Sequence, residues 1–217
     1  MELFSRFVAI WIIVFISPIM LIIGFMSLII QGFPILYKQE RMGFAFRPFL
    51  LYKFRSMQPN DGKEPITKPD DNRITFWGNI LRRFKLDELP QLVNIVKGEM
   101  RFIGPRPEVK EYVNENDFLF LNKIKPGLTD FSSILLRDEE LILEKAGGVE
   151  AYSDLLKLKV ELGQLYAQHK RFWLDLQLVV LTMVSIVFPQ TAIHWVKKYY
   201  IEKYNPELIP EIDKWIA

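Results

Sequence analysis

The sequence predicts an α+β protein that is mostly helical, with an N-terminal membrane helix ahead of a globular domain. An apolar stretch without charged residues runs from Phe7 to Ile30 and is long enough to cross a bilayer. Residues 35–54 contain two runs of strand-forming residues around a turn, which predict a small β-hairpin. Residues 149–188 contain two helical patterns, which predict amphipathic helices at a membrane interface. The expected parts of the chain are a re-entrant membrane helix over 1–31, a globular domain over 32–190 and an aromatic, basic C-terminal tail over 191–217.

The pair Ser17-Pro18 interrupts the apolar stretch near its middle. Pro removes a backbone donor and clashes with the preceding turn, so a kink is expected there. The kinked helix can cross the bilayer as a single span, or it can bend back and leave both ends on the cytoplasmic face. Arg6 precedes the stretch and basic residues follow it, which favours the re-entrant arrangement. A cleaved signal peptide fits less well, because the apolar run is long and no small-residue cleavage site follows.

The composition excludes several classes of site. The chain has 217 residues and no Cys, so it can hold neither a disulfide framework nor a thiolate metal site. Its two His residues make a His-based zinc site a poor hypothesis. The net charge of +2 is too small to indicate a nucleic-acid partner. Basic residues close to the apolar stretch suit a membrane face with anionic lipids instead.

Periodicity and turn residues predict the elements of the globular domain. A turn is expected at Met42-Gly43 in the hairpin, and the polar residues 58–73 contain three prolines and predict a loop. Helices are expected over 76–84, 90–97 and 108–123, with Gly98 ending the second of them. The run Gly104-Pro105-Arg106-Pro107 predicts a stiff, extended loop.

The C-terminal part is apolar and aromatic. The run from Phe172 to Phe188 contains a single charge, Asp175, and is expected to be a partly buried or interfacial helix rather than a second span. In the tail, Trp195 and Trp215 lie among lysines, a composition typical of interfacial anchoring. A contact in a homodimer is an equally open interpretation of the tail.

The adjacent acids Asp87-Glu88 are the strongest candidates for chemistry. Cations precede them at 82–85 and Pro90 follows them. Since Pro favours the first position of a helix, the pair is expected at or just before a helix N-terminus, where backbone N–H groups attract phosphate. This arrangement suggests phosphoryl chemistry. A solvated charge cluster beside an ordinary helix cap is the other interpretation.

Several short motifs follow one another in a specific order over about residues 6–137. They are Ser17-Pro18, Gln39-Glu40-Arg41 with Gly43, Lys53-Phe54-Arg55-Ser56-Met57, Leu86-Asp87-Glu88-Leu89-Pro90-Gln91-Leu92, Lys97-Gly98-Glu99-Met100, Gly104-Pro105-Arg106-Pro107 and Lys125-Pro126-Gly127-Leu128-Thr129. No single motif is decisive, but the ordered set resembles the bacterial sugar transferases known as monotopic phosphoglycosyl transferases.

The resemblance implies a reaction and a location. It implies transfer of a sugar phosphate from a UDP-sugar to polyprenyl phosphate with release of UMP, as the first membrane step of glycan assembly. It implies that Asp87 is the nucleophile, forming a covalent phosphosugar intermediate, and that Mg²⁺ is required. Glu88 is expected to hold Mg²⁺ with Asp87 or to handle protons. The protein is expected in the bacterial cytoplasmic membrane, with its globular part facing the cytoplasm.

Five cations are candidate ligands for the substrate phosphates, because Arg offers a planar fork and Lys a point charge. Lipid headgroup contacts or surface ion pairs are the alternatives for each. The candidates are Arg82, Arg106, Lys53, Arg55 and Arg137. The last keeps the spacing of a family Arg, although residues 130–133 before it depart from the common family pattern.

Two other functions are consistent with parts of the sequence. One is a one-step transferase in which Asp87 binds Mg²⁺ and polyprenyl phosphate attacks the donor directly. The other is a non-catalytic, membrane-anchored scaffold for glycan-assembly enzymes. A scaffold does not need the acidic pair, the Arg106 loop and the strand that carries Lys53 together, which argues against this function.

Overall fold

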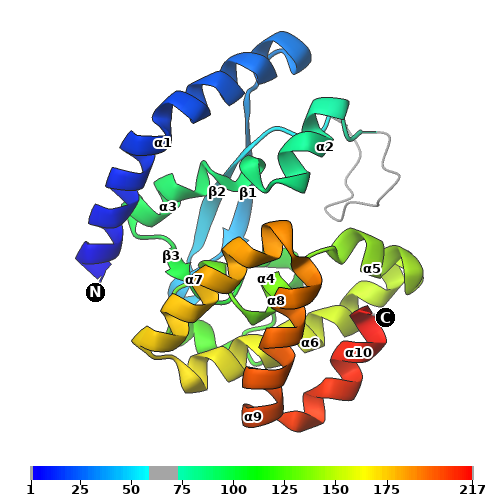
Figure 1. Ribbon diagram of the computed structural model, residues 1–217. Coiled ribbons are helices and arrows are strands. Elements are labelled where there is room, and N and C mark those ends of the chain that lie inside the picture. Colours follow the sequence, from blue (N-terminus) through cyan, green and yellow to red (C-terminus); the bar gives the residue numbers. More distant parts are fainter. Residues whose placement is uncertain (1, 59–72, 217) are drawn as a thin grey trace.

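The computed structural model describes residues 2–58 and 73–216 of the chain. Most of the loop predicted over 58–73 therefore lies outside the described residues. Figure 1 shows a long N-terminal helix at one side, a hairpin beside it and a set of helices formed by the C-terminal half.

Helix α1 (Glu2–Gln31) contains the whole apolar stretch. It continues through Pro18, and the Ser17 hydroxyl donates a hydrogen bond to the carbonyl of Val14 at 2.8 Å. Figure 1 shows its axis bending near mid-length without reversing direction. Its most apolar part has a mean hydropathy of 2.7 and is 11% buried, so most of its apolar surface is exposed. Among the described residues it is the one helix long and apolar enough to cross a membrane.

The predicted hairpin is confirmed. Strands β1 (Leu36–Met42) and β2 (Pro48–Phe54) pair antiparallel, and a short 3-10 turn, η1 (Phe44–Phe46), joins them. A Cβ on Gly43 would lie 2.8 Å from the Arg47 carbonyl oxygen, so this turn requires glycine. The hairpin and α3 bury one side of α1 around Ala9.

Three short helical elements follow the hairpin, and the first and last of them match the helices predicted over 76–84 and 90–97. They are α2 (Phe76–Arg83), the 3-10 turn η2 (Leu86–Glu88) and α3 (Gln91–Lys97). The Thr75 hydroxyl caps α2 by accepting from the Gly78 N–H at 2.8 Å. Gly98, in the left-handed region at φ 78°, ends α3 as expected.

The helix predicted over 108–123 is wrong. The segment instead contains two 3-10 turns, η3 (Lys110–Tyr112) and η4 (Leu119–Asn122). Between them the Asn114 side chain accepts from the Asn116 N–H at 3.0 Å, which is a local turn that competes with helix. Strands β3 (Arg101–Ile103) and β4 (Gly127–Thr129) flank the segment and pair in parallel.

The C-terminal half is helical, and the short helix α4 lies at its centre in contact with α6, α7 and α8. The buried core of this half includes Leu155, Leu158 and Leu162 of α6. The elements are α4 (Phe131–Leu135), α5 (Glu139–Lys145), η5 (Gly148–Ala151), α6 (Tyr152–His169), α7 (Phe172–Val187), α8 (Pro189–Val196), η6 (Lys197–Ile201), α9 (Glu202–Tyr204), η7 (Pro206–Leu208) and α10 (Ile209–Ile216). The predicted helices over 149–168 and 172–188 correspond to α6 and α7.

Residues 191–217 were expected as a tail, and their described apolar side chains pack into this same core. Val196, Ile201 and Ile212 are fully buried there. Trp215 is also buried, so the interfacial anchoring expected of it is wrong, whereas Trp195 is 48% exposed.

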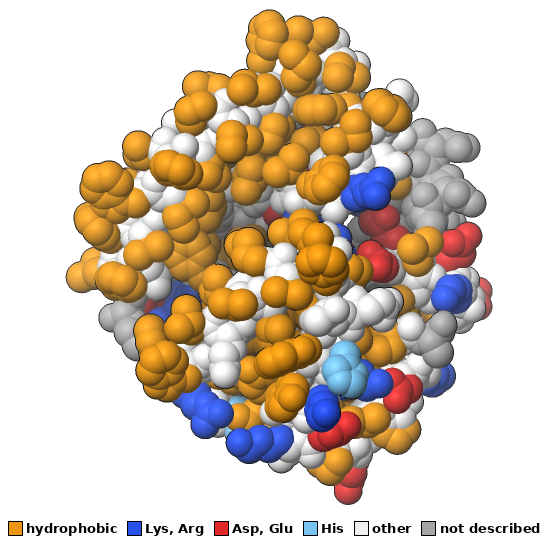
Figure 2. All heavy atoms as spheres, viewed as in Figure 1, with side chains coloured by type: hydrophobic (Ala, Val, Ile, Leu, Met, Phe, Trp, Pro, Cys, Tyr) orange, Lys and Arg blue, Asp and Glu red, His pale blue; other side chains and the backbone are white. Residues whose placement is uncertain are grey.

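Helix α7 has one buried and one exposed apolar side. Leu174, Leu178 and Leu181 face the core, while Trp173 and Met183 are more than half exposed. Figure 2 shows hydrophobic side chains gathered over α1 and on the exposed side of α7. The structure thus agrees with the prediction that α7 is partly buried.

Candidate active site

The acidic pair lies in η2, directly before α3. Lys85 has a left-handed backbone, with φ 56°, which turns the chain between α2 and η2. Asp87 and Glu88 are 5% and 8% exposed, so both carboxylates lie in the protein interior rather than on a solvated surface. The placement just before a helix agrees with the sequence prediction, and the burial rules out a solvated charge cluster.

Glu88 pairs with two cations through one carboxylate oxygen. Its Oε1 accepts from Lys53 Nζ at 3.0 Å and from Arg106 Nη2 at 2.6 Å. Burial opposes ionisation of Glu88, but Arg106 and Lys53 outweigh it and lower the pKa of this carboxyl well below its usual range. The Glu88 carboxylate in turn raises the pKa of the Arg106 guanidinium. Glu88 is therefore a stable anion that fixes two cations in place.

Asp87 has a different environment. Its Oδ2 is 3.9 Å from Lys53 Nζ, and its Oδ1 is buried with no hydrogen-bond partner among the described residues. Burial raises the pKa of Asp87, with the Glu88 charge adding to the effect. A buried carboxylate oxygen without a donor is costly for stability, and such groups are concentrated at functional sites.

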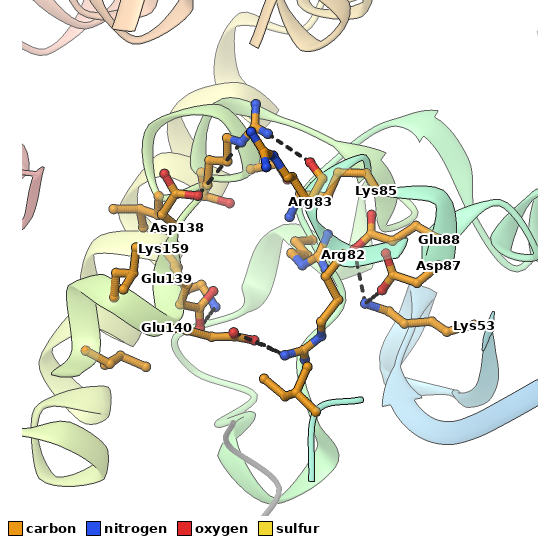
Figure 3. A pocket seen from close by; sticks show the side chains of 18 of the residues that line it. Lys53, Arg82, Arg83, Lys85, Asp87, Glu88, Asp138, Glu139, Glu140 and Lys159 are labelled. Carbon is orange, nitrogen blue, oxygen red and sulfur yellow. Dashed lines mark hydrogen bonds and ion pairs between the residues drawn. The ribbon is translucent and has the colours of Figure 1, made fainter. Parts of the chain in front are cut away.

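The pair lines a cavity of about 990 Å³ that is rich in charged side chains. Figure 3 shows Lys53 beside Asp87 and Glu88 at one side of the cavity, and three acids from the segment around α5 at the other. The cationic lining residues are Arg41, Lys53, Arg82, Arg83, Lys85, Arg106, Arg137 and Lys159. So many cations around one cavity indicate an anionic ligand.

The structure brings four of the five predicted phosphate ligands to this cavity. Lys53 comes from β2, Arg82 from the end of α2, and Arg106 from the extended loop between its two prolines. Arg137 follows α4 and donates to the carbonyl of Arg83 at 3.3 Å.

Arg55, the fifth candidate, lies apart from this group. It is 6% exposed and donates to the carbonyls of Gln31, Gly32 and Phe33 at the end of α1. The last carbonyl groups of a helix have no hydrogen-bond partner within the helix, so Arg55 acts as a C-terminal cap for α1. We therefore leave Arg55 out of the set of phosphate ligands.

A second buried network at the cavity was not found from the sequence. Glu108 accepts from Lys159 Nζ at 2.8 Å and from the Tyr152 hydroxyl at 2.9 Å, and Arg41 lies 3.6 Å away. Lys159 also pairs with Glu139 at 2.9 Å. The sequence offered a weak signal, since Lys159 is a charge on the otherwise apolar face of α6.

The site offers part of a ligand set for a magnesium ion, and substrate phosphates would supply the remaining ligands. Among the described residues no group of three or more His, Asp or Glu side chains is arranged to hold a metal ion. Mg²⁺, however, is often bound by only one or two carboxylates together with substrate phosphates. The unpartnered Oδ1 of Asp87, with Glu88 beside it, fits such a partial set of ligands.

An apolar N-terminal helix precedes a domain whose main cavity combines a buried carboxylate pair with several cations, which suggests a membrane-anchored protein with a site suited to an anionic ligand. The chain belongs to the bacterial sugar transferase family, whose family model matches residues 1–189. This match confirms the resemblance seen in the sequence motifs.

Three relatives illustrate the similarity. The UDP-N-acetylgalactosamine-undecaprenyl-phosphate N-acetylgalactosaminephosphotransferase of Aeromonas hydrophila is 30% identical over 79% of this chain and 40% of its own length. An uncharacterized sugar transferase of Bacillus subtilis, EpsL, is 33% identical over 72% of this chain and 71% of its own length. The UDP-glucose:undecaprenyl-phosphate glucose-1-phosphate transferase of Escherichia coli is 31% identical over 79% of this chain. This chain spans 40% of the Aeromonas relative and 37% of the Escherichia one.

Proposed function

We propose that this protein transfers a sugar phosphate from a UDP-sugar to polyprenyl phosphate and releases UMP. The observation that supports this most is the buried Asp87 Oδ1 without a partner at a cavity lined by cations. The names of two relatives supply the substrate classes, a UDP-sugar and undecaprenyl phosphate. In bacteria this reaction would make polyprenyl-diphosphate-sugar, the first membrane step of a glycan.

The proposed chemistry has two steps, with Asp87 as the nucleophile. One Asp87 carboxylate oxygen attacks the β-phosphorus of the donor, and the bond from that phosphorus to the oxygen bridging the two phosphates breaks. UMP leaves with the bridging oxygen, and the sugar phosphate stays on Asp87. A phosphate oxygen of polyprenyl phosphate then attacks the same phosphorus, which breaks the bond to Asp87 and restores its carboxylate. Covalent catalysis of this kind divides one difficult transfer into two easier ones.

The neighbouring residues support each step. Lys53 and Arg106 are fixed by Glu88, so they can meet the phosphates with little reorganisation. Arg82 at the end of α2 and Arg137 after α4 also line the cavity and offer further contacts for the nucleotide phosphates. When bound, Mg²⁺ would neutralise the diphosphate and the departing UMP, with Asp87 and Glu88 as its protein ligands.

We also propose that α1 is re-entrant and that the globular part lies on the cytoplasmic face. Arg6 near one end of α1 and the basic β1–β2 hairpin after the other both favour the cytoplasm. The exposed apolar side of α7 would then lie in the lipid interface beside α1. Labelling from outside the cell of a Cys placed near the N-terminus would contradict this topology, and the native chain has no Cys to interfere. A Pro18→Ala change should favour a straight, spanning helix.

A release assay tests the proposed function. Full-length protein in detergent is mixed with UDP-glucose or UDP-N-acetylgalactosamine, undecaprenyl phosphate and Mg²⁺, and UMP is measured. We expect continuing UMP release with at least one donor when the acceptor is present. Without the acceptor, UMP release should stop at about one equivalent per protein. A membrane scaffold without catalysis would release no UMP under any of these conditions.

A further inference from the structure

We propose that Glu140 is an internal competitor for Arg82, which a substrate phosphate must displace when the donor binds. This inference rests on the proposed function, because it assigns the Arg82 guanidinium to the donor's diphosphate. It adds a residue outside the family motifs that sets the affinity for the nucleotide. Glu140 follows Arg137, beyond the last of the motifs that carry the resemblance.

The contact that carries this proposal crosses the cavity. Arg82 Nη1 lies 2.8 Å from one Glu140 carboxylate oxygen and 3.1 Å from the other. The two side chains come from opposite sides of the cavity, one from the end of α2 and the other from α5, as Figure 3 shows. A cation that reaches toward the site of an anionic ligand is thus occupied by an acid of the protein itself.

The ionised form of the Glu140 carboxyl is disfavoured at its position in the cavity. Burial raises the pKa of Glu140, even though Arg82 acts in the opposite direction. Asp138 and Glu139 of the same segment also line the cavity, so a donor diphosphate would meet negative charge on this side. Like charges near a bound diphosphate lower its affinity, so the acid must move aside or become protonated as the donor binds.

The structure allows Glu140 to move. Its side chain is 38% exposed, so a rotamer change can turn the carboxylate toward solvent without opening the core. Leu143 is the one buried residue that α5 contributes among its described side chains. Gly147 and Gly148 follow the helix with φ of 107° and 81°, and a Cβ on either would meet no atom within 4 Å. Glu140 can therefore change rotamer while Leu143 and the pair between Glu139 and Lys159 keep α5 in place.

Two other roles for Glu140 lead to different results. A purely structural ion pair between α2 and α5 would leave nucleotide affinity unchanged when it is removed. A carboxylate that accepts from a hydroxyl of the donor's sugar would leave UDP binding unchanged and weaken binding of the complete UDP-sugar.

The test is the affinity of the detergent-solubilised, full-length protein for UDP in the presence of Mg²⁺, measured by titration calorimetry. We expect Glu140→Gln to bind UDP about two- to fivefold more tightly than the unmodified chain, the range that a partly exposed ion pair allows. Glu144→Gln is the matched control, because it removes the same charge from an exposed position on the same helix. It should leave the affinity unchanged. Glu140→Asp, which shortens the reach to Arg82, should give an intermediate gain.

A double-mutant cycle separates competition from general charge effects. In an Arg82→Gln background, Glu140→Gln should improve UDP binding clearly less, because the competition has been removed and only the weaker repulsion between the carboxylate and the diphosphate remains. An unchanged or weaker affinity of Glu140→Gln alone would overturn the proposal. So would a gain of the same size in both backgrounds. If the unmodified chain does not bind UDP at all, the proposed function itself fails, which is a distinguishable result.

Discussion

Two buried groups of carboxylates and cations share one cavity and differ in how completely their charges are paired. Around Glu108, Lys159 and the Tyr152 hydroxyl make short hydrogen bonds, and Arg41 adds a third contact. Around the Asp87-Glu88 pair the cations converge on Glu88, and Asp87 keeps a buried oxygen without a partner. The first group resembles structural ion networks in protein cores, while the second retains a buried carboxylate oxygen without a partner among the described residues, which a ligand can satisfy.

Replacing Asp87 by Asn should produce the largest effect on activity and almost none on stability. The amide cannot form the proposed phosphosugar intermediate, so UMP release should fall at least about 1,000-fold. The substitution also removes repulsion from Glu88 and a charge that burial disfavours. The thermal unfolding midpoint should therefore stay the same or rise by up to about 4 °C. Substantial turnover by this variant would remove Asp87 as the nucleophile.

Replacing Glu108 by Gln should do the reverse and reduce stability first. Lys159 would keep Glu139 but lose its most buried partner, and breaking a buried pair costs about 3 kcal/mol. The free energy of unfolding, from denaturant titration, should fall by about that amount, while folded protein should retain UMP release.

Asp154→Asn is a matched control for this change. Asp154 pairs with Lys157 at 2.7 Å, a similar distance, but both side chains are more than half exposed. Its removal should change the free energy of unfolding far less than Glu108→Gln does, because solvent screens an exposed pair. Equal losses for Asp154→Asn and Glu108→Gln would show that burial does not distinguish the two pairs.

The two groups should also respond differently to pH. Burial raises the pKa of Asp87 above its ordinary value of 3.8, so its nucleophilic carboxylate is lost as pH falls through that raised value. Glu108 has a lowered pKa, because Lys159 and Arg41 outweigh its burial, so its contribution to stability is lost only as pH falls below its ordinary value of 4.5. UMP release should therefore show an acidic limb whose apparent pKa lies above 3.8, and Glu108→Gln should remove the part of the loss of stability that begins below pH 4.5. An acidic limb at or below pH 3.8, or the same acid sensitivity of unfolding with and without Glu108, would contradict the contrast.

The smallest effect is expected for a substitution that tests whether Lys53 and Arg55, two cations of the same segment, have different roles. Arg55 binds the carbonyls that end α1, and Lys cannot span three carbonyls as the guanidinium does. Arg55→Lys should lower the free energy of unfolding by about 1 kcal/mol and leave the KM for the donor unchanged. A raised KM would restore Arg55 to the set of phosphate ligands.

Local signals in the sequence were sufficient for much of the fold. The hairpin, α2, α3, α6 and α7 follow from turn residues, caps and periodicity, all of which act within a few residues. The segment 108–123 misled this approach, because Asn114 forms a turn and the buried residues Phe118, Phe120 and Leu121 pack into the core in and around the 3-10 turn η4. Tertiary packing decides such segments.

The residues of the candidate site that belong to sequence motifs were predicted, and those that only tertiary packing brings together were not. Asp87, Glu88, Lys53 and Arg106 meet as expected. Residue type alone could not distinguish Arg55, which caps a helix, from Lys53, which faces the cavity.

Other members of the site come together across long stretches of the chain. Lys159 reaches Glu108 from α6, and Glu140 reaches Arg82 from α5, contacts over 51 and 58 positions. No local pattern in the sequence encodes such contacts, because they depend on how the helices pack.

Intact-mass measurement of the purified protein tests the role of Asp87 most directly. The full-length chain is mixed with a UDP-sugar that supports turnover and Mg²⁺, with no acceptor present, and its mass is compared with that of Asp87→Asn treated in the same way. We predict a mass increase of one sugar phosphate on the unmodified chain, reversed by polyprenyl phosphate and missing from the variant. A persistent absence of this adduct in protein that turns over would contradict the covalent route and favour direct, one-step transfer.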